Sequence, residues 1–322
     1  MEYTKSSEYA AELLERVTQR VESVIVGKRE EVRFILIAML SGGHVLLEDV
    51  PGTGKTKLIR TLASCLSASF GRIQFTSDVM PSDVTGTSVY KPMTGEFEYR
   101  PGPVMANIVL GDEINRASPR TQSALLEAME EKSVTVDGVT YALPRPFLLM
   151  ATQNPLQFEG TYRLPEAQLD RFLMKLSLGY PGIDEEIEIM NRQESGSRSF
   201  IKPVMLAEEL VKMQREVSGV FVDPVIKKYI AEFAAASRTH KDLLLGISPR
   251  GSLAWMIASQ AAAYLNGRTY VIPDDLKEVA LPVLTHRIRT RYEIVQASDG
   301  ERIVTDLLQH IPIPVQSSRM RG

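Results

Sequence analysis

The chain has 322 residues, of which 44% are hydrophobic and 24% charged, and its formal net charge is −3. This composition excludes a disordered tail and is sufficient for two compact domains with apolar cores. The mildly acidic balance gives no reason to expect nucleic-acid binding through bulk charge. The single cysteine, Cys65, excludes an intramolecular disulfide and a cysteine-rich zinc site.

The N-terminal residues lack the basic start and apolar run of a signal peptide. The longest apolar run, residues 34–40, is far shorter than the roughly 20 residues that a membrane-spanning helix needs. We therefore expect a soluble, cytoplasmic protein without a membrane span. Cys65 lies in an apolar series with helical spacing, so we expect it to be buried.

Apolar periodicity predicts that helices and strands alternate in the first half of the chain. The expected helices are residues 7–22, 28–40 and 119–131, and the expected strands are residues 44–47, 72–76, 107–111 and 147–151. This alternation is typical of an α/β fold with a mainly parallel sheet and helices on both faces.

Two hairpins are expected to interrupt this alternation. Residues 87–91 and 96–100 can pair around Met93-Thr94-Gly95. Residues 133–141 contain Asp137-Gly138 between alternating strands, which is the strongest short hairpin signal in the chain.

Strand signals largely stop after Tyr180-Pro181-Gly182. The helices expected beyond this point are residues 184–193, 204–217, 224–237, 248–266 and 273–284. We therefore predict an α/β domain over residues 1–182 and a smaller all-α domain over residues 183–322.

A glycine-rich turn between a predicted strand and a predicted helix matches a P-loop. Its candidate nucleotide-binding residues are Pro51, Gly52, Thr53, Gly54, Lys55, Thr56 and Lys57. The glycines allow backbone N–H groups close to phosphates, Lys55 can reach the β- and γ-phosphates of ATP, and the Thr56 hydroxyl can hold Mg²⁺. Asp49 replaces the first glycine of the general pattern. It tolerates left-handed backbone angles, and its carboxylate should point away from phosphates.

Two adjacent acids end the apolar strand Ile108-Val109-Leu110. In a P-loop ATPase the first acid holds Mg²⁺ through water and the second activates the attacking water. We therefore assign Asp112 to the metal and Glu113 to the base. A solvated acidic turn is the alternative, and the P-loop upstream favours the catalytic interpretation.

A third polar group follows the buried strand near residue 150. Asn154 is delivered to the carboxyl edge of the sheet, where ligands bind in open α/β folds, and it can orient the attacking water. Asn154-Pro155 also reads as a turn, which is compatible because the turn would aim the side chain.

These motifs together resemble the AAA+ superfamily, and specifically its MoxR members. The resemblance rests on Leu47–Gly52, Asp112–Ala117, Gln153-Asn154-Pro155, Gly160-Thr161-Tyr162, Leu164–Phe172 and Ser248-Pro249-Arg250. It covers the chain from about residue 26 to about residue 287. It implies a P-loop AAA+ sheet domain followed by an α-helical lid.

The resemblance assigns two arginines. Arg171 matches the finger that reaches the γ-phosphate bound by a neighbouring subunit, although a surface charge paired with Asp170 is the alternative. Arg250 matches the sensor-2 arginine at the start of a lid helix. Arg163 stands where MoxR proteins are expected to have proline, so the surrounding loop is expected to differ locally.

The resemblance also identifies the two hairpins with insertions that project into the pore of a ring, with plain surface hairpins as the alternative. The basic cluster of His286, Arg287, Arg289 and Arg291 is more typical of a solvated or interdomain face than of a nucleic-acid site.

The resemblance implies an ATPase that converts ATP to ADP with Mg²⁺, assembles as a homo-oligomeric ring, most often a hexamer, and remodels or matures other proteins as a chaperone-like motor. Partners with von Willebrand factor A domains are expected. The alternatives are a magnesium-chelatase-like subunit, an MCM-like motor on nucleic acid, and a slow nucleotide-dependent binding switch. A small-molecule kinase fits least, because a Glu after the metal acid suits water activation.

Overall fold

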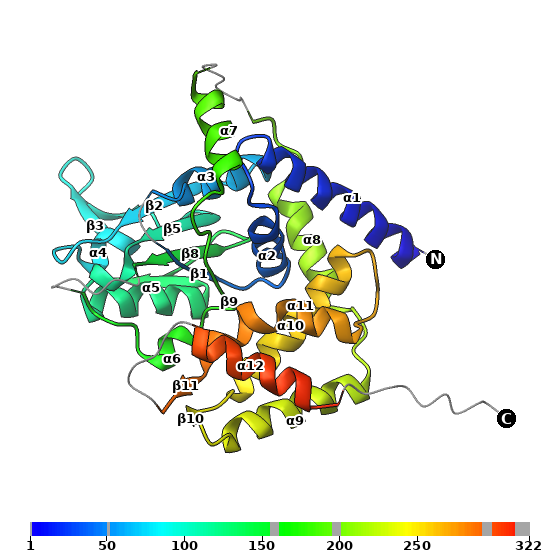
Figure 1. Ribbon diagram of the computed structural model, residues 1–322. Helices are drawn as coiled ribbons and strands as arrows, with labels where there is room; N and C mark the ends of the chain where they lie inside the picture. The colour runs from blue at the N-terminus through cyan, green and yellow to red at the C-terminus, as the bar shows by residue number, and fades with distance from the viewer. Residues whose placement is uncertain (1, 50–51, 155–160, 195–200, 292–297, 313–322) are drawn as a thin grey trace. The chain divides into compact units, whose positions relative to one another are not determined.

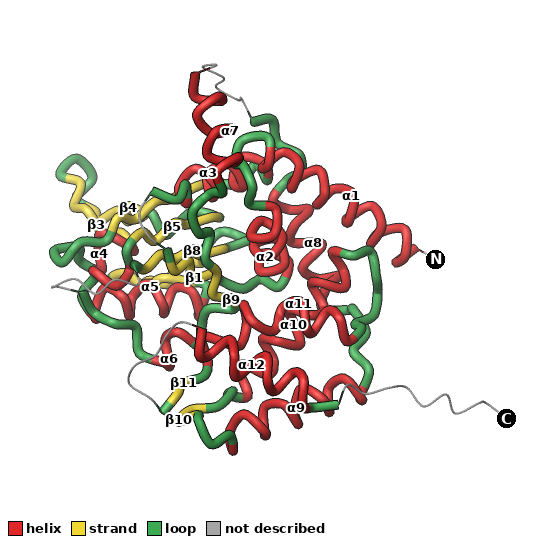
Figure 2. Tube along the Cα trace, in the orientation of Figure 1, coloured by secondary structure: helices red, strands yellow, loops and turns green. Residues whose placement is uncertain are grey.

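The computed structural model describes residues 2–49, 52–154, 161–194, 201–291 and 298–312. The chain divides into two compact units, one of residues 12–215 and the other of residues 1–11 with 216–322. Figure 2 shows that the first unit carries the sheet and two hairpins, while the second is mainly helical. The first unit continues past residue 182 and includes α7 (Ile183–Glu194), and the division at residue 182 stays a prediction.

A five-stranded sheet forms the centre of the first unit, and every pairing in it is parallel. The strands, in spatial order, are β2 (Phe70–Gln74), β5 (Ile108–Asp112), β8 (Leu148–Gln153), β1 (Val45–Glu48) and β9 (Met174–Leu176). The predicted parallel sheet is therefore confirmed. The three-residue β9 at its edge was not predicted, and β2 begins two residues earlier than expected.

Helices cover this sheet on both sides. The helices of the first unit are α2 (Arg29–Leu40), α3 (Lys55–Cys65), α4 (Pro81–Thr85), α5 (Pro119–Glu131), α6 (Glu166–Leu169) and α7, together with parts of α1 (Glu2–Glu22) and α8 (Ala207–Ser218). In Figure 1, α3 lies above the sheet and α5 below it. On the α5 side, Leu125 and Met129 pack with Val109 and Leu149 in one apolar cluster. Because both faces are covered, the central strands can be continuously apolar.

The single cysteine lies at the end of α3, where it is fully buried as predicted. Burial raises the pKa of the Cys65 thiol to about 11. Of the helices that the structure describes, none is both long and apolar enough to cross a membrane.

Both predicted hairpins are confirmed. The first joins β3 (Gly86–Lys91) to β4 (Glu96–Pro101), and the second joins β6 (Ser133–Val136) to β7 (Val139–Ala142). At the second turn Asp137 and Gly138 have φ of 51° and 79°, the left-handed pair that a tight two-residue hairpin turn requires. The rings of Tyr99 and Tyr141 stack with centroids 4.0 Å apart and so join the two hairpins.

A buried histidine precedes β1. His44 Nδ1 accepts a hydrogen bond from the Leu149 N–H at 3.0 Å, and Nε2 lies 3.4 Å from the Met129 carbonyl oxygen. Phe147 packs edge-on against the ring, with centroids 5.5 Å apart. Desolvation by burial lowers the pKa of His44 from 6.5 to about 4, so the ring is neutral at pH 7.

The second unit contains the remaining helices, α9 (Pro224–Thr239), α10 (Pro249–Leu265), α11 (Pro273–Leu284) and α12 (Ser298–His310). Phe233 and Trp255 pack edge-to-face at its core, with centroids 4.8 Å apart, and Trp255 Nε1 donates to the Leu276 carbonyl oxygen at 2.9 Å. Helix α12 was missed, although Ile303, Val304 and Leu307 are buried at helical spacing. A short ribbon of β10 (Leu243–Leu245) and β11 (Arg289–Thr290) adds strands to a unit predicted to be all helical.

Candidate active site

The P-loop connects β1 to α3 in the predicted order. Gly52 and Gly54 have φ of 89° and 83°, and a Cβ at either position would meet nothing within 4 Å. These glycines are therefore required by backbone conformation and not by crowding, and the space beside them is open to a ligand. Gly54 caps α3, so the first N–H groups of that helix form an anion site. Pro51, a candidate nucleotide-binding residue, lies outside the described residues.

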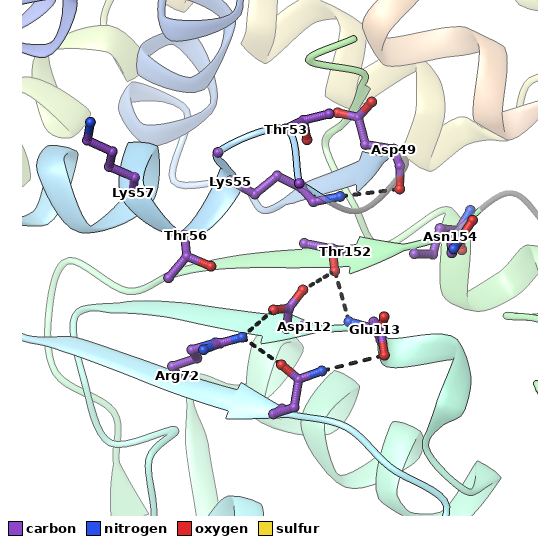
Figure 3. A pocket seen from close by; sticks show the side chains of 14 residues that line it. Asp49, Thr53, Lys55, Thr56, Lys57, Arg72, Asp112, Glu113, Thr152 and Asn154 are labelled. Carbon is purple, nitrogen blue, oxygen red and sulfur yellow. Dashed lines mark hydrogen bonds and ion pairs between the residues drawn. The ribbon is translucent and has the colours of Figure 1, made fainter. Parts of the chain in front are cut away.

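The Asp49 carboxylate is held by the segment that follows β9. The carboxylate accepts hydrogen bonds from the Leu178 N–H at 2.6 Å, the Gly179 N–H at 3.2 Å and the Ser177 hydroxyl at 3.2 Å. Asp49 is not among the residues with a positive φ, so its tolerance of left-handed angles is not used here. The acid is useful here because its oxygens satisfy three donors that follow β9. The Lys55 ammonium donates to the Asp49 carbonyl oxygen at 3.2 Å (Figure 3).

The two predicted acids lie where β5 ends. Asp112 is the last residue of the strand, and Glu113 follows it with φ of 59° and ψ of 49°. A left-handed backbone costs a non-glycine residue on the order of 1–3 kcal/mol, and such strain concentrates at functional sites. The turn separates the two carboxylates so that each has its own partners.

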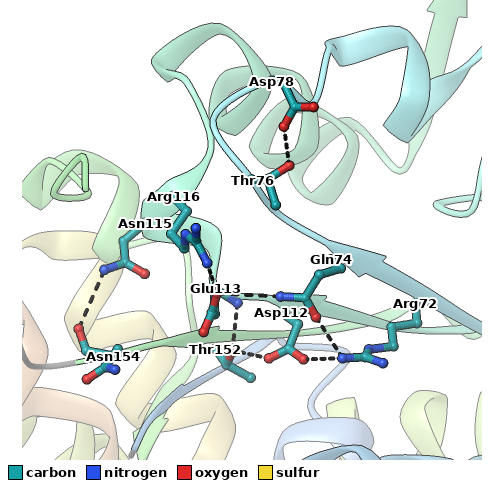
Figure 4. Close-up of polar contacts among 10 residues, drawn as sticks. All are labelled: Arg72, Gln74, Thr76, Asp78, Asp112, Glu113, Asn115, Arg116, Thr152 and Asn154. Atoms are coloured by element: carbon teal, nitrogen blue, oxygen red, sulfur yellow. Dashed lines mark hydrogen bonds and ion pairs between the residues drawn. The ribbon is translucent and has the colours of Figure 1, made fainter. Parts of the chain in front are cut away.

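A threonine that the sequence did not identify ties the acids together. The Thr152 hydroxyl donates to Asp112 Oδ1 at 2.7 Å and accepts from the Glu113 N–H at 2.8 Å (Figures 3 and 4). Thr152 stands in β8, the strand next to β5, and is buried. One hydroxyl thus fixes both the Asp112 carboxylate and the turn that carries Glu113.

Each acid also has a cationic neighbour. Arg72 Nη2 donates to Asp112 Oδ2 at 2.8 Å, and Arg116 Nη1 pairs with Glu113 Oε2 at 2.9 Å. The Gln74 amide nitrogen lies 3.5 Å from the same Glu113 oxygen. Figure 4 shows these side chains in one continuous layer at the carboxyl ends of β2, β5 and β8. Arg72 and Gln74 were not predicted as site residues. Residues two positions apart in a strand point to the same face, so the pair was a signal for a polar face on this strand.

One cavity of about 520 Å³ collects most of these groups. It is lined by Asp49, Gly52, Thr53, Gly54, Lys55, Thr56, Lys57, Arg72, Gln74, Asp112, Glu113, Thr152, Gln153 and Asn154. Every described residue that the sequence predicted for nucleotide, metal, base or water is therefore present. The cavity lies outside the carboxyl ends of the strands, where open α/β sheets bind ligands.

The donor set fits a nucleotide with Mg²⁺. The Thr56 hydroxyl and the Asp112 carboxylate supply the oxygen atoms that Mg²⁺ prefers, and the glycine turn supplies N–H groups for phosphates. Figure 3 shows the Lys57 side chain pointing away from Asp112 and Glu113. Its backbone N–H, in the first turn of α3, is the group that remains for a phosphate.

Two predicted arginines do not line this cavity. Arg171 follows α6 and forms an ion pair with Glu130 of α5 at 2.9 Å. Arg250 belongs to the other unit, in the first turn of α10, where the Ser248 hydroxyl caps the helix by accepting from the Gly251 N–H at 3.0 Å. The roles of Arg171 and Arg250 stay predictions.

The basic cluster near residue 290 is only partly exposed. His286 and Arg287 are buried in the second unit, whereas Arg289 and Arg291 are exposed. A continuous charged face is therefore absent along this segment.

Comparisons with known proteins identify the family. Residues 44–174 match the model of the ATPase family associated with various cellular activities (AAA), and residues 235–307 match that of the AAA lid domain. The first match contains the P-loop and both acids, and the second contains Arg250. Fold and site thus define a P-loop ATPase of the AAA+ class.

Relatives of similar length place the chain more closely. It is 53% identical over 314 residues to the uncharacterized protein YeaC of Bacillus subtilis, covering 96% of this chain and 97% of that one. It is 41% identical over 311 residues to Chaperone MoxR1 of Mycobacterium tuberculosis, covering 94% and 82% respectively. The chain therefore belongs to the MoxR family of AAA+ ATPases.

A solved structure shares the whole architecture. The crystal structure of a candidate ATPase from Cytophaga hutchinsonii superposes with a TM-score of 0.90 at 38% sequence identity. It covers 97% of this chain and 98% of that chain.

Proposed function

We propose that this protein hydrolyses ATP to ADP and phosphate with Mg²⁺ and uses the cycle to remodel or mature partner proteins. The observation that supports this most strongly is the shared cavity. It contains a P-loop with open glycines, a metal acid at the end of β5, and a second acid held in a strained turn beside it.

The residues of the cavity divide the work of phosphoryl transfer. Lys55 and the N–H groups at the start of α3 bind phosphate oxygens, and Thr56 and Asp112 hold the metal ion. Bound Mg²⁺ supplies positive charge that neutralises the phosphates. Glu113 accepts a proton from the attacking water, and Asn154 orients that water. In the isolated chain Glu113 is paired with Arg116, so this contact must loosen before Glu113 acts as a base.

A second subunit completes the site in this proposal. Arg171 lies outside the cavity of its own chain and is about one-third exposed, which suits a group that reaches a neighbour's γ-phosphate. An arginine supplied in trans accelerates other P-loop enzymes by about 10³–10⁵-fold. This requires a homo-oligomeric ring, which we propose to be a hexamer, with Arg250 of the lid as a further phosphate contact.

The output of the cycle follows the family. The similarity to a protein named Chaperone MoxR1 supports a chaperone-like role, with client proteins and a von Willebrand factor A domain protein as partners. Nucleic acid is not proposed as a partner, because two members of the basic cluster are buried.

Replacing the base tests the proposal. Glu113→Gln should lower kcat by about 10²–10⁴-fold, because general-base catalysis contributes that much. Binding of a non-hydrolysable ATP analogue with Mg²⁺ should stay within a few-fold of the wild type. Glu127→Gln, an exposed position on α5, is the matched control and should leave turnover unchanged.

Turnover of Glu113→Gln at the wild-type rate would contradict the assignment of the base. A wild-type protein that binds Mg-ATP tightly but never turns it over, with or without partners, would instead favour a binding switch.

A further inference from the structure

Arg72 stands at a position in the sheet that faces the metal acid. Strand β2 pairs with β5 in parallel register, so Gln74 lies opposite Asp112 and Arg72 lies two residues earlier on the same face. The side chain of Arg72 is 44% exposed and lines the cavity. Strand β2 lies at the edge of the sheet, and β5 and β8 separate it from β1, the strand that precedes the P-loop. Arg72 therefore approaches Asp112 from the side away from the P-loop (Figure 3).

One guanidinium nitrogen joins two polar side chains. Arg72 Nη2 donates to Asp112 Oδ2 at 2.8 Å and to Gln74 Oε1 at 2.7 Å. The amide nitrogen of Gln74 in turn faces Glu113 Oε2 at 3.5 Å. The circuit closes through Thr152, which contacts Asp112 on one side and the Glu113 N–H on the other (Figure 4).

This circuit restricts both acids. Thr152 holds one oxygen of Asp112 and Arg72 holds the other, so the carboxylate has one orientation. Each oxygen still has a second lone pair that can accept from a metal-bound water. By occupying the Gln74 oxygen, Arg72 also determines that the Gln74 amide presents its NH₂ group to Glu113. The bonds that Arg72 donates are charge-assisted, and such bonds are about twice as strong as neutral ones.

We propose that Arg72 is a positioning residue that orients the metal acid Asp112 directly and the base Glu113 through Gln74. The same guanidinium then prepares the cavity for metal binding and for water activation. This inference rests on the proposed function, because it takes Mg-ATP as the ligand of the cavity. It adds a residue that neither the P-loop nor the acidic pair contains.

The first experiment measures metal binding without catalysis. Binding of a non-hydrolysable ATP analogue is titrated by calorimetry at increasing Mg²⁺, and again in EDTA. In Arg72→Gln the Mg²⁺ concentration at half-saturation should rise about tenfold, since loss of a group that orients a metal ligand typically costs 10–100-fold in affinity. Binding in EDTA should stay within twofold of the wild type, because the P-loop is unchanged.

Two further variants separate the two contacts of Arg72. Arg72→Lys keeps a cation beside Asp112 but lacks the fork that reaches both partners, so metal binding should recover while kcat stays reduced. Gln74→Leu should likewise bind Mg²⁺ as the wild type does and show a reduced kcat. Arg120→Gln, an exposed arginine on α5 outside the cavity, is the matched control and should change neither quantity.

Normal or tighter Mg²⁺ binding in Arg72→Gln would overturn the inference, and tighter binding would identify Arg72 as a competitor of the metal instead. A wild-type protein that binds Mg-nucleotide without turnover would sink the hydrolysis proposal, while the metal titration would still test Arg72. A wild-type protein that binds no Mg-nucleotide would overturn both.

Discussion

The two ends of β1 each bury a titratable side chain, and they do so in opposite ways. His44 precedes the strand and is kept neutral, with one ring nitrogen accepting from Leu149 and desolvation lowering its pKa to about 4. Asp49 follows the strand and is surrounded by donors from Ser177, Leu178 and Gly179. The amino end of the sheet thus tolerates a polar group by removing its charge, whereas the carboxyl end holds an acid with hydrogen bonds to its oxygens.

This difference matters for the site, because a charged carboxyl edge is where a P-loop enzyme needs oriented acids. Asp112 and Glu113 are held by the same means as Asp49, namely donors placed on each oxygen or on the adjacent backbone.

The largest effect is expected from acidification at His44. Its pKa is 6.5 when unfolded and about 4 when folded, so the unfolded chain binds more protons between these values. Its contribution to stability is therefore complete above pH 6.5 and is lost as the pH falls toward 4. The loss can reach about 3 kcal/mol of the free energy of unfolding.

Denaturant unfolding at pH 7 and at pH 4.5 measures this contribution. The difference in unfolding free energy between the wild type and His44→Gln should shrink on acidification. His310→Gln, at an exposed histidine, should follow the wild type in parallel. A His44→Gln curve parallel to the wild type would show that His44 is not kept neutral by burial.

A smaller effect is expected at the other end of the strand. Asp49→Asn replaces one of two accepting oxygens with an NH₂ group. Oδ2 accepts from the Leu178 N–H, and Oδ1 accepts from the Gly179 N–H and the Ser177 hydroxyl. One buried donor then loses its partner, at a cost of about 1–3 kcal/mol of unfolding free energy. Chemical denaturation at pH 7 measures this cost. Ser177→Ala removes one donor and leaves the acid in place, so it should cost less than Asp49→Asn. Equal stability of Asp49→Asn and wild type would contradict the role given to the carboxylate.

The smallest effect on stability is expected from Thr152→Val, which keeps shape but removes the hydroxyl between Asp112 and the Glu113 N–H. Unfolding free energy should fall by about 1 kcal/mol. Turnover should fall by about tenfold, because both acids lose a fixed contact. Steady-state kinetics and a melting curve measure the two effects. Unchanged kcat in a folded Thr152→Val protein would remove Thr152 from the machinery.

Much of the fold and of the candidate site is predictable from the sequence, because it depends on local patterns. The strand, glycine turn and helix around Lys55 form one continuous segment, and the two acids directly follow the strand that contains Leu110. The structure places both segments at the same cavity, as expected. The Asp137-Gly138 turn was equally local. Such features need only neighbouring residues to specify them.

The circuit around the acids was not accessible in the same way. Arg72, Gln74 and Thr152 come from two other strands, and their contacts depend on strand order and register, which no single segment contains. Strand β9 was missed for a related reason, since three residues carry too little pattern. Helix α12 could have been predicted, because its apolar residues Ile303, Val304 and Leu307 recur at helical spacing in the sequence.

An active site built between subunits makes ATPase activity per subunit depend on protein concentration, and we would measure this dependence. The wild type should become more active as concentration rises, while Arg171→Ala stays low throughout. Glu130→Gln breaks the same exposed ion pair, worth about 0–1 kcal/mol, but keeps the arginine, so it should behave as the wild type. Activity that is independent of concentration, or full activity in Arg171→Ala, would contradict a site shared between subunits.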